Sequence, residues 1–413
     1  MEVGGCDLVE LARRHGTPLY VYDEDTVRQR ASEYIAAMDG AGQVLYSAKA
    51  FASPQFLRVV AEEGLGLDVV SAGELHLALK SDFPRDRIFF LGNNKSVEDL
   101  QSAYTAGATI VIDGSHEFDL LRDVIPDGQR ASVMLRISPG VKPDTLDHIS
   151  TGQLDSKFGF SIESGAARAA VATALEHPRL ELVGLHSHIG SQIFALGAYE
   201  KAMEIMLDLL VQLRDELGFE PRKLGAGGGL GIAYTRKDDP PTPRYFVETV
   251  RQALATGTAR RGLKVPQLVV EPGRSIAGPA GMALYTVGSI KDIPGVRRYV
   301  AVDGGMGDNI RPKLYGARYE AYLASAPERA HDGVVTIAGK YCESTDILIT
   351  DIEMPALKPG DVIALPAAGA YCLAMASNYN GMPRPEVLML RDGEARIMRR
   401  RETLDDLVAA EVF

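Results

Sequence analysis

The chain has 413 residues and a formal net charge of −11 at pH 7. A chain of this length exceeds one ordinary hydrophobic core, so we expect two domains. The acidic balance argues against a nucleic-acid-binding protein, because such proteins usually carry a basic patch.

The three cysteines, Cys6, Cys342 and Cys372, are scattered and form no C-x-x-C pair. A zinc ribbon or redox motif is therefore unsupported, and we expect no metal site. Scattered thiols are typical of a reducing compartment, which predicts a cytoplasmic protein. Residues 1–10 contain no apolar run, and no stretch reaches the ~20 apolar residues of a membrane span, so we expect neither a secretory signal nor a membrane partner.

The first two thirds of the chain alternate short apolar or β-branched runs with stretches of helical spacing. Eight such runs predict an α/β fold, a (β/α)8 TIM-type barrel. The runs are residues 44–46, 67–70, 88–91, 109–112, 133–137, 182–185, 223–224 and 268–270, and helical spacing covers 54–63, 73–80, 96–106 and 198–217. An open doubly wound sheet ranks lower, because no G-x-G-x-x-G follows the first run.

After residue 278 the pattern changes to short extended runs separated by Gly, Pro and Asp, which predicts a C-terminal antiparallel β domain. The runs are residues 282–290, 298–302, 334–338, 347–352, 362–365 and 387–390. We assign the early run 19–22 to the same domain. The predicted domains are therefore 26–277 for the barrel, and 1–25 with 278–413 for the β domain.

Active sites of such barrels lie at the C-terminal ends of the strands. Reactive residue types collect at these positions: Lys49, Ser71, Asn93, Asn94, Asp113, Arg136, His188, Gly227, Gly228, Gly229, Glu271 and Arg274. Lys49 has small neighbours, which suits an imine to an aldehyde cofactor. A lone lysine is more often an exposed strand cap, so its interpretation depends on the other residues.

The run GAGGGLG at 225–231 leaves backbone N–H groups bare enough to surround a phosphate. A flexible turn is the alternative interpretation of such a run. The Ser191 hydroxyl and the Arg274 guanidinium are candidates for further donors to the same phosphate.

Glu271, in the string EPGR, is a candidate partner for the pyridine nitrogen of pyridoxal phosphate. A carboxylate there keeps the ring nitrogen protonated, so that the ring withdraws electrons from the substrate α-carbon. The alternative is an ion pair with Arg274. In the string GLHSHIGSQ, we interpret His188 as a ring that stacks on the cofactor and His186 as a packed core residue.

An ordered series of short motifs resembles the diaminopimelate decarboxylases, which belong to the alanine-racemase-like, fold type III pyridoxal-phosphate enzymes. The motifs are GTPLYVYD (16–23), YSAKA around Lys49, DVVSAGEL (68–75), GNNKS (92–96), TG (151–152) with SKFG (156–159), HSHIGSQI, GGGLG, EPGRSI, DNIRPKLYGA (308–317), CESTD (342–346) and GAY (369–371). The series extends to about residue 380 in the order of the family. The resemblance implies a barrel followed by a β domain.

The resemblance also implies a role for individual residues. Lys49 would form the imine, and the cofactor would further contact Asp68, His188, Ser191, Gly227, Gly228, Gly229, Glu271, Gly273, Arg274 and Tyr371. The substrate would contact Arg274, Arg311, Tyr315, Glu343 and Tyr371, and Cys342 would supply a proton after CO2 leaves. In this family the CES segment reaches the active site of the partner subunit, which implies a homodimer with shared sites.

Arg311 and Glu343 fit a substrate that carries an amino group and a carboxylate at each of its two ends. One end reacts with the cofactor, so the other must be held as a zwitterion, its carboxylate by arginine and its ammonium by Glu343. An ornithine decarboxylase would need no arginine for a distal carboxylate, whereas Arg311 is present here. The alternatives are a surface salt bridge for Arg311 and a buried apolar filler for Cys342.

The predicted reaction is the decarboxylation of meso-2,6-diaminopimelate to L-lysine and CO2, the last step of lysine biosynthesis. Phe51 after Lys49-Ala50, where the family usually has Asn, and Lys340-Tyr341 before Cys342 depart from the family pattern. They keep open a decarboxylase of a related amino acid or of a carrier-bound glutamyl group. A non-catalytic paralogue that binds pyridoxal phosphate ranks lowest, because Lys49, Glu271 and Cys342 are all retained.

Overall fold

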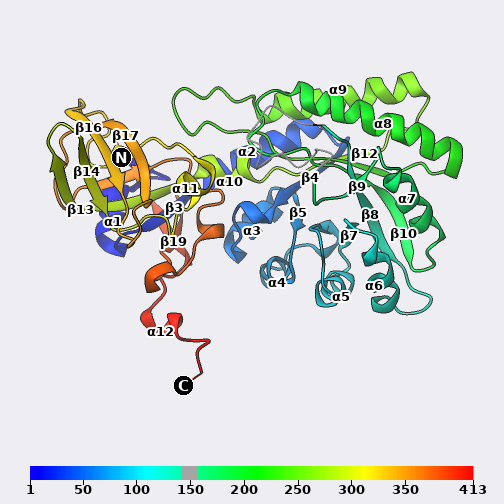
Figure 1. The fold of residues 1–413 in the computed structure, drawn as a ribbon, viewed down its shortest axis with the longest axis horizontal. Helices are drawn as coiled ribbons and strands as arrows, with labels where there is room; N and C mark the ends of the chain where they lie inside the picture. Colours follow the sequence, from blue (N-terminus) through cyan, green and yellow to red (C-terminus); the bar gives the residue numbers. More distant parts are fainter. Residues whose placement is uncertain (142–155, 413) are drawn as a thin grey trace. The chain divides into compact units, whose positions relative to one another are not determined.

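A computed structural model describes residues 1–141 and 156–412, which divide into two compact units. The barrel unit comprises Arg30–Gly231 and Asp239–Ser275, and the β unit comprises Met1–Gln29, Ile232–Asp238 and Ile276–Phe413. Figure 1 gives the order of their helices and strands along the chain. The short segment 232–238 belongs to the β unit although it lies within the barrel sequence.

The barrel unit contains a closed ring of eight parallel strands. They are β4 (Gly42–Ser47), β5 (Gly66–Val69), β6 (Ile88–Phe90), β7 (Thr109–Ile112), β8 (Ala131–Ser138), β10 (Leu180–His186), β11 (Lys223–Gly227) and β12 (Gln267–Val270). Each pairs with the next, β8 pairs with β10, and β12 pairs with β4, which closes the ring. The predicted (β/α)8 barrel is confirmed, and each strand overlaps one predicted run.

Helices surround this ring. They are α3 (Pro54–Glu62), α4 (Ala72–Lys80), α5 (Val97–Ala106), α6 (His116–Val124), α7 (Ala166–Glu176), α8 (Gly197–Leu217) and α9 (Pro243–Arg261). The helices α2 (Glu24–Met38) and α10 (Arg274–Ala280) each contain residues of both units. In Figure 1, α3 to α6 lie side by side in a row next to β5–β8. Ser53, Ser71 and Ser96 begin three of them, because each serine side chain accepts the N–H of the third helical residue.

The interior of the ring is filled by apolar side chains from successive strands. Leu45, Phe89, Leu91, Val111, Met134, Val183 and Val269 form one buried cluster. A two-residue strand, β9 (Phe160–Ser161), pairs with the end of β8 outside the ring. Because the barrel interior is packed, any ligand must bind at the rim.

The β unit is built around a sheet of seven successive strands. Their order is β17 (Ile347–Met354), β16 (Gly333–Ala338), β14 (Arg297–Val302), β13 (Gly281–Ile293), β3 (Leu19–Asp23), β19 (Glu386–Arg391) and β20 (Glu394–Arg399), with β18 (Val362–Leu365) and β15 (Tyr322–Leu323) joined through β13. The predicted β domain is confirmed, and the run 19–22 does pair within it. Its core includes Leu19, Val21, Leu284, Ala364 and Leu388.

Two pairings in this sheet are parallel and differ from the expected antiparallel arrangement. They join β14 to β16 and β3 to β19. Parallel neighbours need a long connection rather than a hairpin. Between β14 and β16 that connection contains the short helix α11 (Arg311–Tyr315), whereas β3 and β19 come from opposite ends of the chain.

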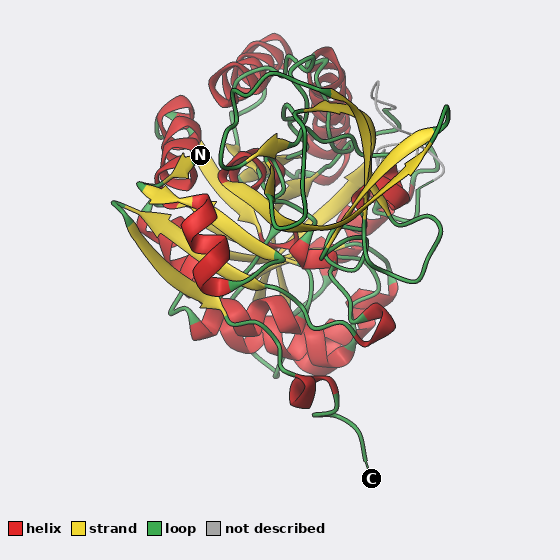
Figure 2. Cartoon of the chain, turned by 90° about the vertical axis from the view of Figure 1, so that its left-hand side faces the viewer, coloured by secondary structure: helices red, strands yellow, loops and turns green. Residues whose placement is uncertain are grey.

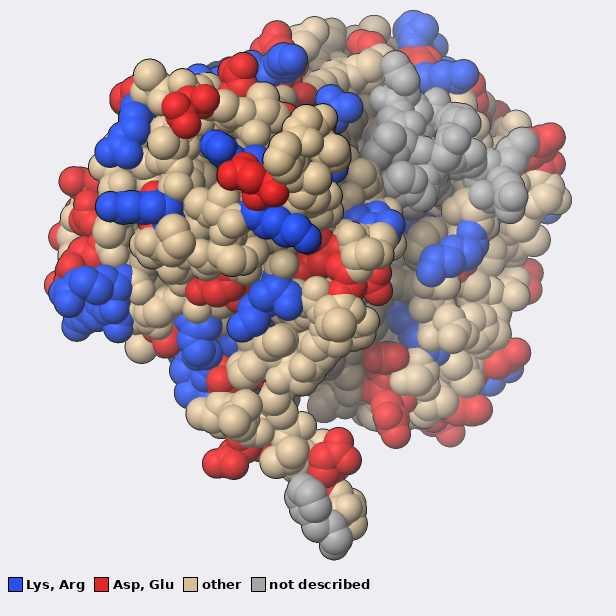
Figure 3. Space-filling model, turned by 60° about the vertical axis from the view of Figure 1, so that its left-hand side comes forward, with Lys and Arg blue, Asp and Glu red and all other residues tan. Residues whose placement is uncertain are grey.

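The remaining elements of the β unit are small. They are β1 (Glu2–Val3), β2 (Cys6–Asp7), α1 (Leu8–His15) and α12 (Leu404–Leu407). Figure 2 shows the chain ending in α12 and a loop. On the face drawn in Figure 3, basic and acidic side chains are interspersed. Within the described residues, no helix combines the length and apolar character needed to cross a membrane.

Candidate active site

The strands of the ring all run in the same direction, so the side chains that follow their C-terminal ends share one rim. Lys49 lies in a 3-10 turn (Ala48–Ala50) directly after β4, exposed between two buried alanines. The neighbouring strand β12 leads into Glu271, and the Ser47 N–H donates to the Pro272 carbonyl at 3.0 Å. Lys49 and Glu271 therefore lie at the same end of the barrel.

Gly273 lets the EPGR turn pack directly on the lysine turn. A Cβ at this position would lie 3.0 Å from both the Cβ and the carbonyl oxygen of Ser47, and 3.1 Å from the Ala50 Cβ. Any larger residue would push the two turns apart. The glycine predicted as a cofactor contact thus has a packing reason of its own.

Glu271 is buried, and its partner is His186 rather than Arg274. The His186 Nε2 lies 2.9 Å and 3.0 Å from the two Glu271 carboxylate oxygens. Burial by itself would raise the pKa of the Glu271 carboxyl, but His186, Lys49 and Arg136 outweigh it and hold the pKa below its usual range. Glu271 is therefore ionised at neutral pH, as a partner for a protonated ring nitrogen must be.

His188 lies against the glycine run. The Gly228 N–H donates to the His188 Nδ1 at 3.3 Å, and a Cβ on Gly227 would come within 2.6 Å of that nitrogen. Burial lowers the pKa of His188 well below its ordinary value, and the positive charges of Lys49 and Arg136 lower it further. The imidazole is therefore neutral, which suits a ring that stacks on a flat cofactor.

The three glycines of the run sit where side chains would collide. A Cβ on Gly228 would lie 1.9 Å from the Glu271 carbonyl oxygen, and one on Gly229 would lie 2.1 Å from the Gly190 carbonyl oxygen. Gly227 and Gly229 also have positive φ angles of +70° and +99°. The run is therefore a tightly built loop at the rim and not an open flexible turn.

Arg274 and Ser191 come together at this rim. The Arg274 Nη2 and Nε lie 2.9 Å and 3.3 Å from the Ser191 hydroxyl oxygen, and Arg274 is buried. A buried guanidinium beside a hydroxyl is a suitable pair of donors for a phosphate. The two residues predicted for that role are therefore neighbours.

Asp68 supplies a buried oxygen without a partner. The Ser47 hydroxyl donates to its Oδ2 at 2.6 Å, whereas its Oδ1 is buried and accepts no hydrogen bond among the described residues. Burial raises the pKa of this carboxyl, and the nearby Lys49 ammonium opposes that shift. A buried oxygen without a hydrogen-bond partner indicates that a ligand bound at this rim supplies a hydrogen-bond donor to Asp68.

The barrel residues together fit pyridoxal phosphate. They combine an exposed lysine, an ionised carboxylate, a neutral imidazole, a hydroxyl–guanidinium pair and a tightly built glycine loop on one rim. Each matches one chemical group of that cofactor.

Apart from Arg274, which belongs to the barrel unit, the predicted substrate residues lie in the β unit, where Arg311 has an unusual environment. Its side chain is buried, its guanidinium carbon lies 4.5 Å from the Tyr234 ring centroid, and Nη1 donates to the Tyr319 hydroxyl. Its Nε is buried without a hydrogen-bond partner, and no carboxylate of the described residues forms an ion pair with it. A buried cation of this kind is a ready binding site for an anion.

The other predicted β-unit residues are more accessible. Cys342 and Glu343 are exposed in the loop between β16 and β17, and Tyr315 is half-buried at the end of α11. Tyr371 is half-buried and has a left-handed φ of +62°, which non-glycine residues seldom adopt. Arg311, Tyr315, Cys342, Glu343 and Tyr371 thus all belong to the β unit.

Two contacts at the rim were not anticipated from the sequence. His186 was interpreted as a core residue but contacts Glu271, and Arg136 pairs with Asp113 at 3.5 Å with its guanidinium carbon 4.2 Å from the Phe158 ring centroid. The only available signal was that Asp113 directly follows β7 and that Arg136 lies near the C-terminal end of β8. The TG motif, Thr151-Gly152, which precedes SKFG, lies outside the described residues.

Glu74 on α4 leads to a prediction about pH. Its Oε2 accepts the Val70 N–H at 2.8 Å, and burial raises its pKa to about 7 from the ordinary 4.5. A raised folded-state pKa adds stability below pH 4.5 that is lost as the pH rises through about 7. We expect Glu74→Gln to reduce this loss, measured by urea unfolding of the cofactor-free protein between pH 4.5 and 7.5. Glu98→Gln, at an exposed position, should keep the wild-type profile, and an equally steep profile in Glu74→Gln would contradict the assignment.

Comparisons with known proteins agree with these features. Residues 24–278 match the family described as "Pyridoxal-dependent decarboxylase, pyridoxal binding domain". The chain is 47% identical to a diaminopimelate decarboxylase of Bacillus subtilis, with 100% of this chain and 95% of that protein covered. Among solved structures, it resembles a diaminopimelate decarboxylase of M. jannaschii in co-complex with L-lysine (35% identity, TM-score 0.90, coverage 98% and 94%) and one of Helicobacter pylori complexed with L-lysine (31%, 0.88, 97% and 98%).

Proposed function

We propose that this chain, which belongs to the pyridoxal-dependent decarboxylases, converts meso-2,6-diaminopimelate into L-lysine and CO2. The family match and the full-length similarity to diaminopimelate decarboxylases support the reaction type. The observation that carries the substrate assignment is the buried guanidinium of Arg311, which lacks a carboxylate partner among the described residues. Such a group is suited to bind an anion, and the distal carboxylate of diaminopimelate is one.

Pyridoxal phosphate would bind at the rim of the barrel unit. Lys49 would bind its aldehyde covalently, Glu271 would keep a proton on the ring nitrogen, and His188 would contact the ring. Asp68, Gly227, Gly228, Gly229 and Gly273 line the same site, and Ser191 and Arg274 donate to the phosphate. When bound, the cofactor withdraws the electron pair that CO2 leaves behind.

The β unit binds the rest of the substrate. Arg311 pairs with the distal carboxylate, Glu343 accepts hydrogen bonds from the distal ammonium, and Tyr315 and Tyr371 also contact the substrate. Arg274 contacts the substrate from the barrel unit. The Cys342 thiol donates a proton to the carbon that has lost CO2, and solvent later returns a proton to the sulfur. Each charged end of the substrate thus meets a group of opposite charge.

We also propose that the protein is a homodimer located in the cytoplasm. The exposed Cys342–Glu343 segment would serve the active site of a partner subunit, so the enzyme works as a homodimer. The three cysteines have no disulfide between them, which agrees with a cytoplasmic protein.

A substrate panel tests the proposed reaction. Purified protein loaded with pyridoxal phosphate is expected to release CO2 from meso-diaminopimelate and to form an equal amount of lysine. Lysine, ornithine and arginine should give at most about a hundredth of that rate, because they lack a distal carboxylate to satisfy a buried arginine. Turnover of one of them without turnover of diaminopimelate would indicate a related decarboxylase. A loaded protein that releases no CO2 from any substrate would indicate a non-catalytic paralogue.

A further inference from the structure

We propose that Asp346 and Asn380 are positioning residues that set the direction from which Cys342 delivers its proton. This inference deepens the proposed function and rests on the proton-donor role of Cys342 in it. The residues concerned all belong to the β unit, and the loop at issue is residues 339–346 between β16 and β17.

Asp346 ties this loop to a second one. One carboxylate oxygen accepts the Tyr341 N–H at 2.9 Å, and the other accepts the Met306 N–H at 2.7 Å. Met306 lies in the segment that leads into α11, where the Asn309 N–H donates to the Gly305 carbonyl at 2.9 Å. One buried carboxylate therefore fixes the proton-donor loop and the segment before Arg311 relative to each other.

The backbone around Asp346 is built to receive that carboxylate. A Cβ on Gly305 would lie 2.6 Å from both carboxylate oxygens, and a Cβ on Gly339 would lie 2.1 Å from Oδ2. Gly305 also has a φ of +153°, at the edge of the region that favours glycine. The absence of a side chain at Gly305 and Gly339 thus leaves room for the Asp346 carboxylate. A loop that only had to turn would not need both glycines.

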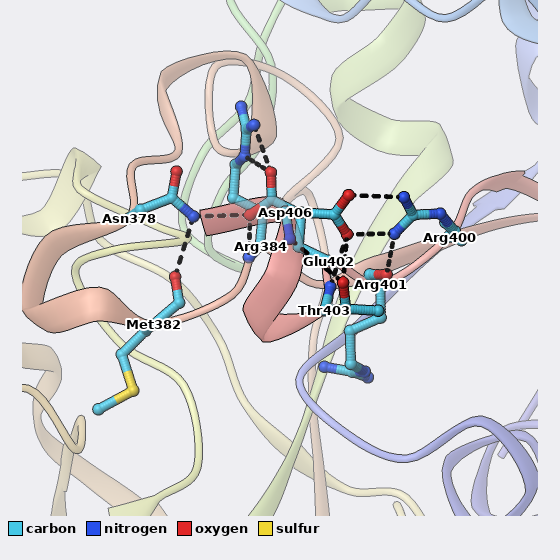
Figure 4. A network of polar contacts seen from close by, with 8 residues as sticks. All are labelled: Asn378, Met382, Arg384, Arg400, Arg401, Glu402, Thr403 and Asp406. Atoms are coloured by element: carbon cyan, nitrogen blue, oxygen red, sulfur yellow. Dashed lines mark hydrogen bonds and ion pairs between the residues drawn. The ribbon is translucent and has the colours of Figure 1, made fainter. Parts of the chain in front are cut away.

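Asn380 holds the same loop from the other side. Its Oδ1 accepts the Cys342 N–H at 2.8 Å. The segment that carries Asn380 is itself held by Glu402, whose carboxylate accepts hydrogen bonds from the Asn378 side chain at 2.6 Å and from the Arg384 N–H at 2.8 Å (Figure 4). Burial opposes ionisation of Glu402, but the Arg384 hydrogen bonds outweigh it and lower the pKa to about 2.

These contacts fix two consecutive amides. The Tyr341 N–H is held by Asp346 and the Cys342 N–H by Asn380, so the backbone direction at Cys342 is set from both sides. The Cys342 residue itself is exposed. A thiol on an exposed loop delivers a proton from one direction only if the backbone that carries it is held in this way.

The stereochemistry of the product records this direction. When the bond to the carboxylate breaks, CO2 leaves and its electron pair stays on the carbon. That carbon takes the thiol proton, a C–H bond forms, and the thiolate takes a proton from solvent. The carbon becomes the ε-CH2 of lysine, so reaction in D2O gives an ε-CHD centre, which is a single epimer if the acid delivers from one side.

The test compares Asp346→Asn and Asn380→Gly with the wild-type holoenzyme. Asp346→Asn removes one of the two acceptors, and Asn380→Gly removes an acceptor while allowing the φ of +55° at this position. We expect kcat to fall about 10-fold or more in each, because the proton donor is displaced. The ε-CHD product should become a mixture of epimers. Asn380→Asp, which keeps the oxygen, should restore a single epimer.

A second readout does not depend on the substrate. Cys6 and Cys372 are buried, so alkylation by iodoacetamide reports on Cys342, and its rate should change at least about 3-fold in both variants. Glu353→Gln, an exposed carboxylate change on β17, is the matched control and should leave all values unchanged. If Asp346→Asn does not fold, the Asn380 variants decide.

The outcomes separate the two levels of the proposal. A wild-type enzyme that forms no lysine from diaminopimelate overturns the proposed function, whatever the variants do. A wild-type enzyme that forms lysine, with unchanged kcat, epimer purity and alkylation rate in the variants, overturns the positioning role alone.

Discussion

Lys49→Ala is expected to abolish decarboxylation, with kcat falling by about 10³-fold or more. Lys49 would hold the cofactor covalently at the rim, and it is the lysine that directly follows β4. Alanine keeps the small size of its neighbours Ala48 and Ala50, so the turn should keep its shape. The variant should therefore fold while losing its reaction.

The measurement combines turnover with absorbance. The wild-type protein with pyridoxal phosphate should show the visible band of a lysine-linked cofactor, and Lys49→Ala should show the spectrum of the free aldehyde. Lys80→Ala, on the exposed end of α4, is the control and should match the wild type in both. If Lys49→Ala kept the wild-type turnover, the proposed covalent bond between Lys49 and the cofactor would be wrong.

Arg311→Met is expected to lower kcat/KM for diaminopimelate by about 10²-fold or more, mainly through KM. Removing one partner of a buried charge pair costs roughly 2–5 kcal/mol, much of it because the other charge stays unpaired. Methionine approximates the length of the arginine stem and can still pack on Tyr234 and Tyr319. The substrate carboxylate, however, would then be buried without a donor.

Comparing substrates shows whether Arg311 binds the distal carboxylate. Any residual rate on ornithine or lysine should change less than about 3-fold, because neither has a carboxylate at the distal end. Arg318→Met, an exposed arginine in the same segment, should leave both substrates unaffected. Equal losses on diaminopimelate and ornithine in Arg311→Met would instead point to damage of the fold, and a thermal melt would separate the two effects.

Most of the fold could be predicted from the sequence. Strand and helix periods differ, so the eight apolar runs and the stretches between them were recognisable without knowledge of their neighbours. The change after residue 278 was equally local, because turn residues there recur every few positions. The two-residue strands β1, β2, β9 and β15 and the hairpin strand β20 were missed, since each has few apolar residues or only two residues.

The group of barrel residues could also be predicted, for a topological reason. Once a parallel barrel is accepted, every residue after a strand end shares one rim. Lys49, Glu271 and Arg274 therefore needed no coordinates to be placed together. Their hydrogen-bond partners could be identified only from the structure, because a partner depends on which strands are neighbours and on the register between them.

The sequence by itself determined the element types, the shared rim and the chemistry of the residues on it, because these follow from local periodicity and residue type. Only the tertiary structure decided that His186 binds Glu271. His186 on β10 is paired with Gly225 on β11, and a Cβ on that glycine would lie 2.9 Å from the imidazole. The ring therefore crosses over a strand without a side chain to reach the residue after β12. Such a contact depends on register across three strands, and so does the joining of two loops by Asp346; neither leaves a periodic trace in the sequence.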